Sequence, residues 1–159
     1  MRIDPTRKVH PQMKTATLLR VGARIATGST YAVLGWDALR TPGARVQMAT
    51  GALDAIRKIL PLPQNDELIV RGNASVQAVG GSLLAVGVYP RASALALVLS
   101  LIPTTIAGHN FWAIDDPAAR KLQRTQFHKN VAMFGGLLFA MVDSTNYRRA
   151  PAPKTQLAS

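Results

Sequence analysis

The 159-residue sequence has no cysteine and only eight acidic residues, against nineteen lysines and arginines. Without cysteine, this chain's own side chains form no disulfide, catalytic thiol, cysteine-ligated zinc site or iron–sulfur cluster. The hydrophobic share of 48% is too high for a disordered chain, and the length suits one domain. A net charge of +11 is compatible with nucleic acid, anionic lipid or the flanks of a membrane protein as the partner. The distribution of the charge along the sequence distinguishes between these three kinds of partner.

The basic residues avoid the apolar segments and gather around them. Six of them lie within the first 24 residues, and three follow Val142. Nucleic-acid binding needs a basic folded face with stacking aromatics, but the nine aromatic residues lie mostly on apolar segments. We therefore expect a lipid bilayer and no nucleic acid as a partner.

Four apolar segments organise the chain, and one of them, Ala92 to Trp112, has no charged residue over 21 positions. About 18 apolar residues suffice for a helix to cross a bilayer. We predict an all-α fold, an antiparallel four-helix integral membrane bundle with spans at about 18–39, 68–89, 92–112 and 127–143. Residues 1–17 are expected to form a basic, poorly ordered arm, residues 18–145 the membrane domain, and residues 146–159 a polar tail.

The loop between the first two segments has its own helical pattern. Apolar residues recur at helical spacing between turn signals at Thr41-Pro42-Gly43 and Pro61-Leu62-Pro63. The pattern predicts an amphipathic helix at about residues 44–60. This helix is expected to lie on the outer membrane surface or to pack on the core.

Glycine and aromatic residues also favour a membrane fold. Glycine pairs such as Gly80-Gly81 and Gly135-Gly136 allow close helix packing in lipid, whereas glycine costs about 1 kcal/mol per position in a soluble helix. Trp36, Tyr89 and Trp112 stand at segment ends, where interfacial anchors are expected. A soluble, basic all-helical protein is the alternative that hydropathy alone leaves open.

Four spans place both termini on the same side of the membrane. On that side lie ten of the nineteen basic residues, and nine lie on the other. The positive-inside rule thus favours cytoplasmic N- and C-termini by a small margin.

A series of motifs runs from the third segment into the fourth. It comprises His109-Asn110-Phe111-Trp112, an Asp- and Ala-rich loop at 115–120, Phe127-His128-Lys129-Asn130 and Gly135-Gly136-Leu137-Leu138. Together with Gly35-Trp36-Asp37 and the Pro90-Arg91 turn, the series resembles the DoxX family of small four-helix membrane proteins, in its actinobacterial branch. The resemblance covers about residues 18–145. Two positions depart from it, since Asn110 stands where such members often have proline and His128 where leucine is common.

The resemblance implies a multi-pass protein of the bacterial plasma membrane. Relatives include a subunit of a thiosulfate:quinone oxidoreductase and membrane anchors that join redox enzymes. It therefore implies a subunit or anchor of an oxidoreductase assembly linked to redox or oxidative stress, with a protein partner and no catalytic residues of its own. A fold alone does not fix either role, and the oligomeric state stays open.

Six polar residues are expected near one membrane face, and they form the candidate ligand site: Asn73, Gln77, His109, Asn110, Lys129 and Asn130. Asn73 and Gln77 are four residues apart, so they share a helix face and should point into the bundle. A histidine beside a lysine and amides suits the carbonyl of a quinone cofactor or a sulfur oxyanion. The alternative is that these residues bond one another and stabilise the bundle. Three histidines without ligand spacing predict no metal site.

Overall fold

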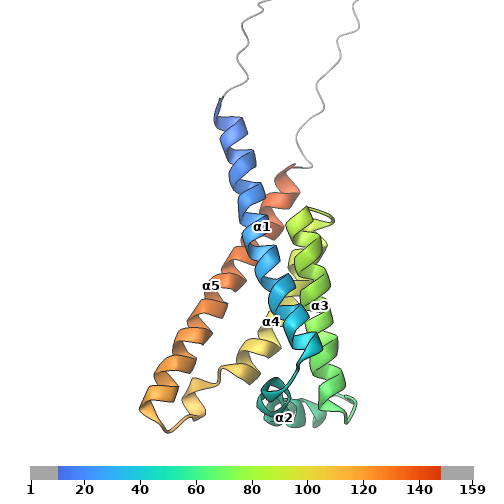
Figure 1. Ribbon diagram of the computed structural model, residues 1–159, viewed down its shortest axis with the longest axis vertical. Helices are drawn as coiled ribbons and strands as arrows, with labels where there is room; N and C mark the ends of the chain where they lie inside the picture. The colour runs from blue at the N-terminus through green and yellow to red at the C-terminus, as the bar shows by residue number, and fades with distance from the viewer. Residues whose placement is uncertain (1–10, 148–159) are drawn as a thin grey trace, which may run out of the picture.

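The computed structural model describes residues 11–147, with the side chains of residues 15–143, and this part of the chain is helical throughout its regular structure. Its elements are α1 (Pro11–Arg40), α2 (Ala44–Arg57), α3 (Asp66–Val86), α4 (Pro90–Gly108), the short 3-10 helix η1 (Phe111–Ala113) and α5 (Pro117–Tyr147). Helices α1, α3, α4 and α5 run along the molecule, and α2 lies across one end (Figure 1). We call this the α2 end, and the opposite end, which holds the α3–α4 turn, the Tyr89 end.

The helix boundaries lie close to the expected segments except at two places. Helices α2, α3 and α4 lie within a few residues of the predicted ranges. Helix α1 begins at Pro11, so residues 11–17, expected to be poorly ordered, are helical. Helix α5 begins at Pro117, ten residues before the predicted start at 127. The rest of the predicted arm, residues 1–10, and the tail at 148–159 lie outside the described residues.

The early start of α5 has a local cause. The Asp116 carboxylate accepts a hydrogen bond from the backbone N–H of Ala119 at 2.6 Å, and Pro117 occupies the first helical position. Both features are typical of helix starts. The following residues, Ala-Ala-Arg-Lys-Leu-Gln, are strong helix formers, so the helix extends beyond the apolar run on which the prediction rested.

Helices α3 and α4 form an antiparallel hairpin with a short turn. The Asn65 side chain accepts a hydrogen bond from the N–H of Leu68 at 3.0 Å, which caps the start of α3. Gly87 ends α3 in the left-handed conformation, at φ 76°. Tyr89 also adopts a left-handed backbone, at φ 45°, and Pro90 then starts α4. The predicted joint at Pro90-Arg91 is therefore the first turn of α4.

Helices α1 and α3 pack through small residues. A Cβ atom built on Gly28 would lie 2.5 Å from the backbone nitrogen of Ala85 and 2.6 Å from the carbonyl oxygen of Gly81. Gly35, two turns further along α1, meets the backbone of α3 at Ala78 just as closely. Such backbone contact needs residues without side chains on the facing surfaces, which is how small residues pack helices in membranes.

The buried core is small and centres on α4. Tyr31 of α1, Leu84 of α3, Leu97 of α4 and Leu137 of α5 are almost fully buried in one cluster. Partly buried residues of α5, such as Met133, pack against it. Toward the α2 end, α5 leans away from α1 and α3 (Figure 1). The core is therefore continuous between α1, α3, α4 and α5 only over part of their length.

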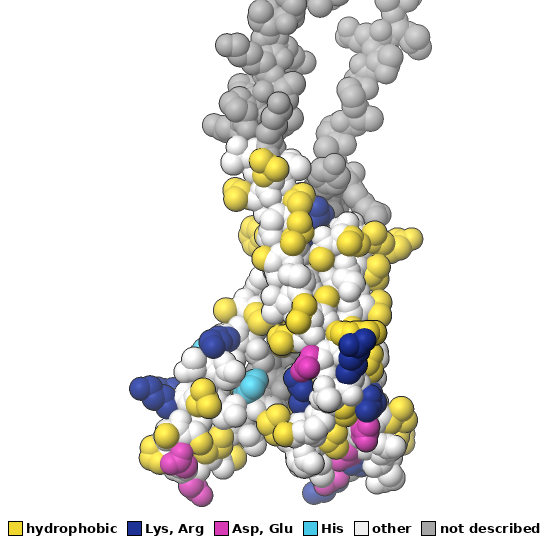
Figure 2. Space-filling model, viewed as in Figure 1, with side chains coloured by type: hydrophobic (Ala, Val, Ile, Leu, Met, Phe, Trp, Pro, Cys, Tyr) yellow, Lys and Arg dark blue, Asp and Glu magenta, His cyan; other side chains and the backbone are white. Residues whose placement is uncertain are grey.

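Large apolar side chains are more often exposed than buried. Among the described residues, 26 large hydrophobic side chains are exposed, while 11 hydrophobic residues are buried. Figure 2 shows apolar side chains over the half of the molecule toward the Tyr89 end, and most charged side chains toward the α2 end. A soluble monomer seldom exposes contiguous apolar surface on this scale. Lipid is the solvent that such a surface fits.

By length and composition, one helical stretch in the described residues is apolar enough to cross a bilayer, Pro90–Ala113. It comprises α4 and η1 and corresponds to the predicted span 92–112. The other three predicted spans do not meet this test. Arg20 and Arg24 interrupt α1, Arg71 interrupts α3, and Lys129 follows a basic first half of α5. The four-span bundle is therefore not confirmed.

Candidate functional site

A polar cluster joins α3 to α4 inside the bundle. The Asn73 amide donates a hydrogen bond to the Thr104 hydroxyl at 2.9 Å and accepts one from the Ser100 hydroxyl at 2.8 Å. The Gln77 amide donates to the same Thr104 oxygen at 3.4 Å. The Thr104 hydroxyl donates in turn to the Ser100 carbonyl, one helical turn earlier, at 2.8 Å. Asn73, Gln77, Ser100 and Thr104 thus form a connected network, which we call the α3–α4 network.

The spacing of the four residues creates this network. Residues four apart lie on one helix face, and this holds for Asn73 and Gln77 and for Ser100 and Thr104. Gln77 and Ser100 are buried, at 9% and 5% exposure. Buried amides need partners because desolvation without a hydrogen bond is costly. The network supplies partners to both amides and so stabilises the contact between α3 and α4.

Further polar contacts join α4 to α5. The Asn130 amide donates to the hydroxyl of buried Thr105 at 3.1 Å. His109, at the end of α4, has its Nδ1 atom 2.7 Å from the Gln123 amide oxygen. Since an amide oxygen only accepts, Nδ1 carries the proton, and Nε2 is the acceptor in the neutral ring. These two contacts hold the middle of α5 against the end of α4.

Lys129 and Asn110, the other two predicted site residues, are exposed. Asn110 precedes η1, and its carbonyl accepts from the Ala113 N–H at 2.9 Å. Lys129 borders a shallow, open hollow on one face of α5, together with Arg124, Thr125 and His128. The structure thus joins Asn73 to Gln77, and it gives His109 and Asn130 partners in α5 and α4, respectively. The expected His109–Lys129 site is not among the contacts that it describes.

Three aromatic rings gather where α4 meets α5. Phe111, Trp112 and Phe127 contact one another edge to face, with centroids 5.2 to 6.0 Å apart. The ring of His128 lies 5.9 Å from that of Phe127. Edge-to-face contacts of this kind add to the burial of aromatic surface. This aromatic group fixes the chain turn between α4 and α5.

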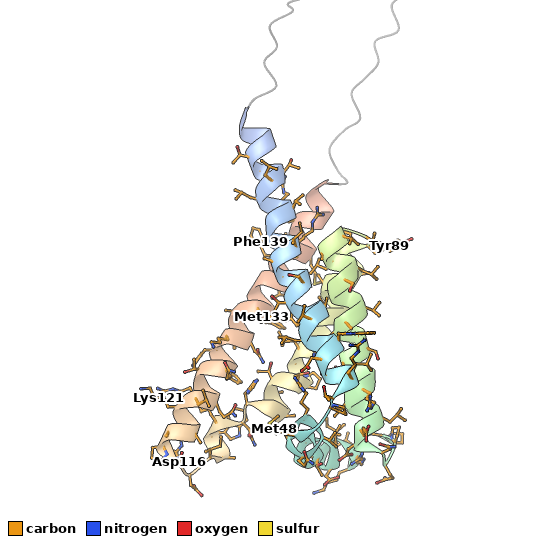
Figure 3. All side chains as sticks on the ribbon, viewed as in Figure 1. Met48, Tyr89, Asp116, Lys121, Met133 and Phe139 are labelled. Atoms are coloured by element: carbon orange, nitrogen blue, oxygen red, sulfur yellow. The ribbon has the colours of Figure 1, made fainter. Side chains whose placement is uncertain are left out.

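The three predicted anchors are all exposed, at 50% for Trp36, 69% for Tyr89 and 58% for Trp112. Trp36 lies under the Arg40 guanidinium, 4.6 Å from its ring centroid. Tyr89 lies at one end of the molecule (Figure 3), and Trp112 belongs to η1, which lies between α4 and α5 in the chain. Exposed aromatic side chains of this kind are typical of the membrane–water interface.

Ion pairs gather at the α2 end. Arg57 of α2 pairs with Asp54, at 2.9 Å, and with Asp66 at the start of α3. The Arg57 guanidinium lowers the pKa of the Asp66 carboxyl, and a hydrogen bond from Thr50 adds to this effect. The hydrogen bond to Asp66 in turn raises the pKa of Arg57. Arg71 bonds Glu67, at 2.8 Å, and the Leu39 carbonyl at the end of α1. These contacts attach α2 and the end of α1 to α3.

Sequence reasoning missed the hydroxyl and amide partners, namely Ser100, Thr104, Thr105 and Gln123. A signal for two of them was present, since Ser100 and Thr104 are four residues apart on an otherwise apolar helix. Within the described residues, His, Asp and Glu form no group of three or more that could hold a metal ion.

Comparison with known protein families shows which family the chain resembles. The DoxX family model matches residues 19–110, which extend from the first third of α1 to just past the end of α4. The chain belongs to the DoxX family. This membership indicates a membrane protein linked to oxidoreductase or stress functions. Helix α5, with the Phe127–Asn130 and Gly135-Gly136 motifs, lies beyond the matched range in this DoxX protein. No curated protein and no solved structure matches the chain.

Proposed function

We propose that this DoxX protein is a four-span integral protein of the bacterial plasma membrane that anchors a redox enzyme, as a subunit without catalytic residues of its own. The observation that carries the proposal is DoxX membership across residues 19–110. The apolar surface of the four long helices supports it.

The helix lengths support four spans. At about 1.5 Å per residue, α3 and α4 are about 30 Å long, close to the hydrocarbon thickness of a bilayer. Helices α1 and α5, with 30 and 31 residues, are about 45 Å long and extend beyond it. In this proposal α2 lies at the outer surface, and both termini are cytoplasmic.

The polar contacts inside the bundle support an anchor more than a catalyst. Asn73, Gln77, Asn130 and His109 each have a hydrogen-bond partner on a neighbouring element. Side chains engaged in this way hold helices together. A quinone or sulfur oxyanion bound at the His109–Lys129 cluster would have to compete with these contacts. The redox chemistry therefore belongs to a protein partner, which the chain holds at the membrane.

Copurification tests the proposal. The full chain with an affinity tag is isolated from native membranes in mild detergent, and the bound proteins are identified by mass spectrometry. An unrelated tagged four-span protein is the control. We expect an oxidoreductase subunit enriched over the control. Recovery of the chain in a salt-washed soluble fraction, or copurification without any redox enzyme, would contradict the proposal.

Ligand binding by the purified chain alone separates the anchor from a site of its own. A soluble quinone analogue or thiosulfate is titrated against the wild type, His109→Ala and Lys129→Ala. Saturable binding that both substitutions abolish would replace the anchor with a ligand-binding function. We expect no binding that depends on these residues.

A further inference from the structure

We propose that α5 binds the phosphate of an anionic phospholipid in the hollow bordered by Arg124, His128 and Lys129. The hollow is shallow and open to solvent, because all the residues that line it, Thr125 and Ala132 included, belong to one face of α5. The inference rests on the membrane placement proposed above and adds a specific lipid site to it.

Arg124 and Lys129 carry positive charge that no carboxylate of the described residues neutralises. In the described part of the chain, the salt bridges engage Arg20, Arg45, Arg57 and Arg71, but neither Arg124 nor Lys129. Arg120, one turn earlier on α5, donates to the Ile114 carbonyl and is engaged there. Arg124 and Lys129 therefore have charge available for an anion.

The side chains that line the hollow have the chemistry to bind a phosphate. A guanidinium binds phosphate oxygens through two parallel N–H bonds, and an ammonium adds a second positive charge. The His128 ring adds a hydrogen-bonding group on the same helix face, while the Thr125 hydroxyl donates to the Lys121 carbonyl at 3.0 Å. Lys121, one turn earlier on α5, extends away from the bundle (Figure 3) and adds positive charge beside the hollow. This donor set fits a phosphate monoanion.

In the proposed membrane placement, Arg124 and Lys129 also lie at the depth of the lipid headgroups. Phe127 contacts Trp112 at 6.0 Å, and tryptophan marks the level of the lipid headgroups. Arg124 and Lys129 lie within one turn of Phe127, thus within about 5 Å along the helix axis. The cations are then at the height of lipid phosphates, with exposed Val131 and the apolar remainder of α5 beside the acyl chains. A soluble acidic partner would need only the positive charge, and the charge would not have to lie at the depth of the headgroups.

The test measures binding of short-chain phosphatidylglycerol to the full-length protein in a neutral detergent, followed by native mass spectrometry. The double variant Arg124→Gln/Lys129→Gln is compared with Lys58→Gln/Arg91→Gln, which removes the same charge from exposed positions outside α5. At about 1 kcal/mol per basic residue, we expect roughly 30-fold weaker binding for the first variant. The control variant should bind as the wild type does.

Other probes identify the source of the phosphate. Inorganic phosphate and phosphatidylcholine are titrated in parallel, and both should compete at least tenfold less well than phosphatidylglycerol. Equal competition by inorganic phosphate would assign the hollow to a soluble anion and overturn the lipid proposal. Equal lipid binding by both double variants would also overturn it. If the α5 variant keeps lipid binding and loses a copurified protein, the hollow is a protein-docking surface instead. None of these outcomes depends on whether the chain anchors a redox enzyme.

Discussion

Gly28 on α1 and Gly81 on α3 face each other so closely that neither position has room for a methyl group. A Cβ atom on either glycine would lie 2.6 Å from the carbonyl oxygen of the other. A Cβ atom on Gly81 would also meet the backbone of Ala32. The contact is between backbones, so no side chain can move aside to relieve it.

The substitution Gly28→Ala should therefore force α1 away from α3. Overpacking of this kind costs about 1–3 kcal/mol, although alanine favours the helix itself. We expect a lower thermal midpoint in detergent than for the wild type. The matched control is Gly136→Ala on α5, where an added Cβ meets no atom within 4 Å. Equal midpoints for the two variants would contradict the close α1–α3 contact.

Thr104 is the shared acceptor of the α3–α4 network, so Thr104→Val should remove both hydrogen bonds that its hydroxyl accepts, together with the one it donates to the Ser100 carbonyl. The Asn73 and Gln77 amides lose this partner in a low-polarity environment. We expect destabilisation of about 1–2 kcal/mol, measured by denaturant or thermal unfolding in detergent. Thr30→Val makes the same chemical change at an exposed site, where the hydroxyl bonds only the Ala26 carbonyl of its own helix. A Thr104 variant as stable as the Thr30 variant would show that the network contributes nothing.

Asp66 links stability at the α2 end to pH. Its pKa lies below the ordinary value of 3.8, chiefly because of the hydrogen bond from Arg57. A depressed carboxyl pKa stabilises the fold above the ordinary value, and the contribution is lost as pH falls through the folded-state pKa. We expect Asp66→Asn to be less stable than the wild type at pH 7, with the difference shrinking below about pH 3.8.

Thermal midpoints measured from pH 7 to pH 3 check this expectation. Asp54→Asn is the matched control, because Asp54 pairs with the same arginine but its side chain is 60% exposed. Exposed pairs contribute little. A difference between wild type and Asp66→Asn that stays constant over the whole pH range would rule out the link.

The sequence predicts the helices better than their contacts. Apolar runs bounded by proline and glycine gave α2, α3 and α4 within a few residues. The same criterion put the start of α5 too late, because residues 117–126 form a helix through capping and propensity, not through apolar character. The helical start of α1 at Pro11 was missed because residues 11–17 contain no apolar run.

The candidate site depends on which face each helix turns to its neighbours, and sequence spacing determines only part of this. The spacing of Asn73 and Gln77 correctly implied a shared face toward the bundle. It could not reveal that Thr104 would receive both amides, or that Gln123 would bond His109. Lys129, next to Asn130 in sequence, borders the hollow on α5, while Asn130 bonds Thr105 of α4. Adjacent residues on a helix differ by about 100° in direction, so they reach different surroundings.

The most direct test of the four-span account is the sidedness of single cysteines. The chain has no cysteine of its own, so Gln64→Cys, Ala92→Cys, Ala118→Cys and a cysteine appended after Ser159 each report one position. Intact cells are treated with a membrane-impermeant maleimide, and permeabilised cells give the total. We expect labelling from outside at 64 and 118, and labelling only after permeabilisation at 92 and the appended cysteine. Positions 64 and 92 labelled from the same side, or 118 and the appended cysteine from the same side, would contradict four spans.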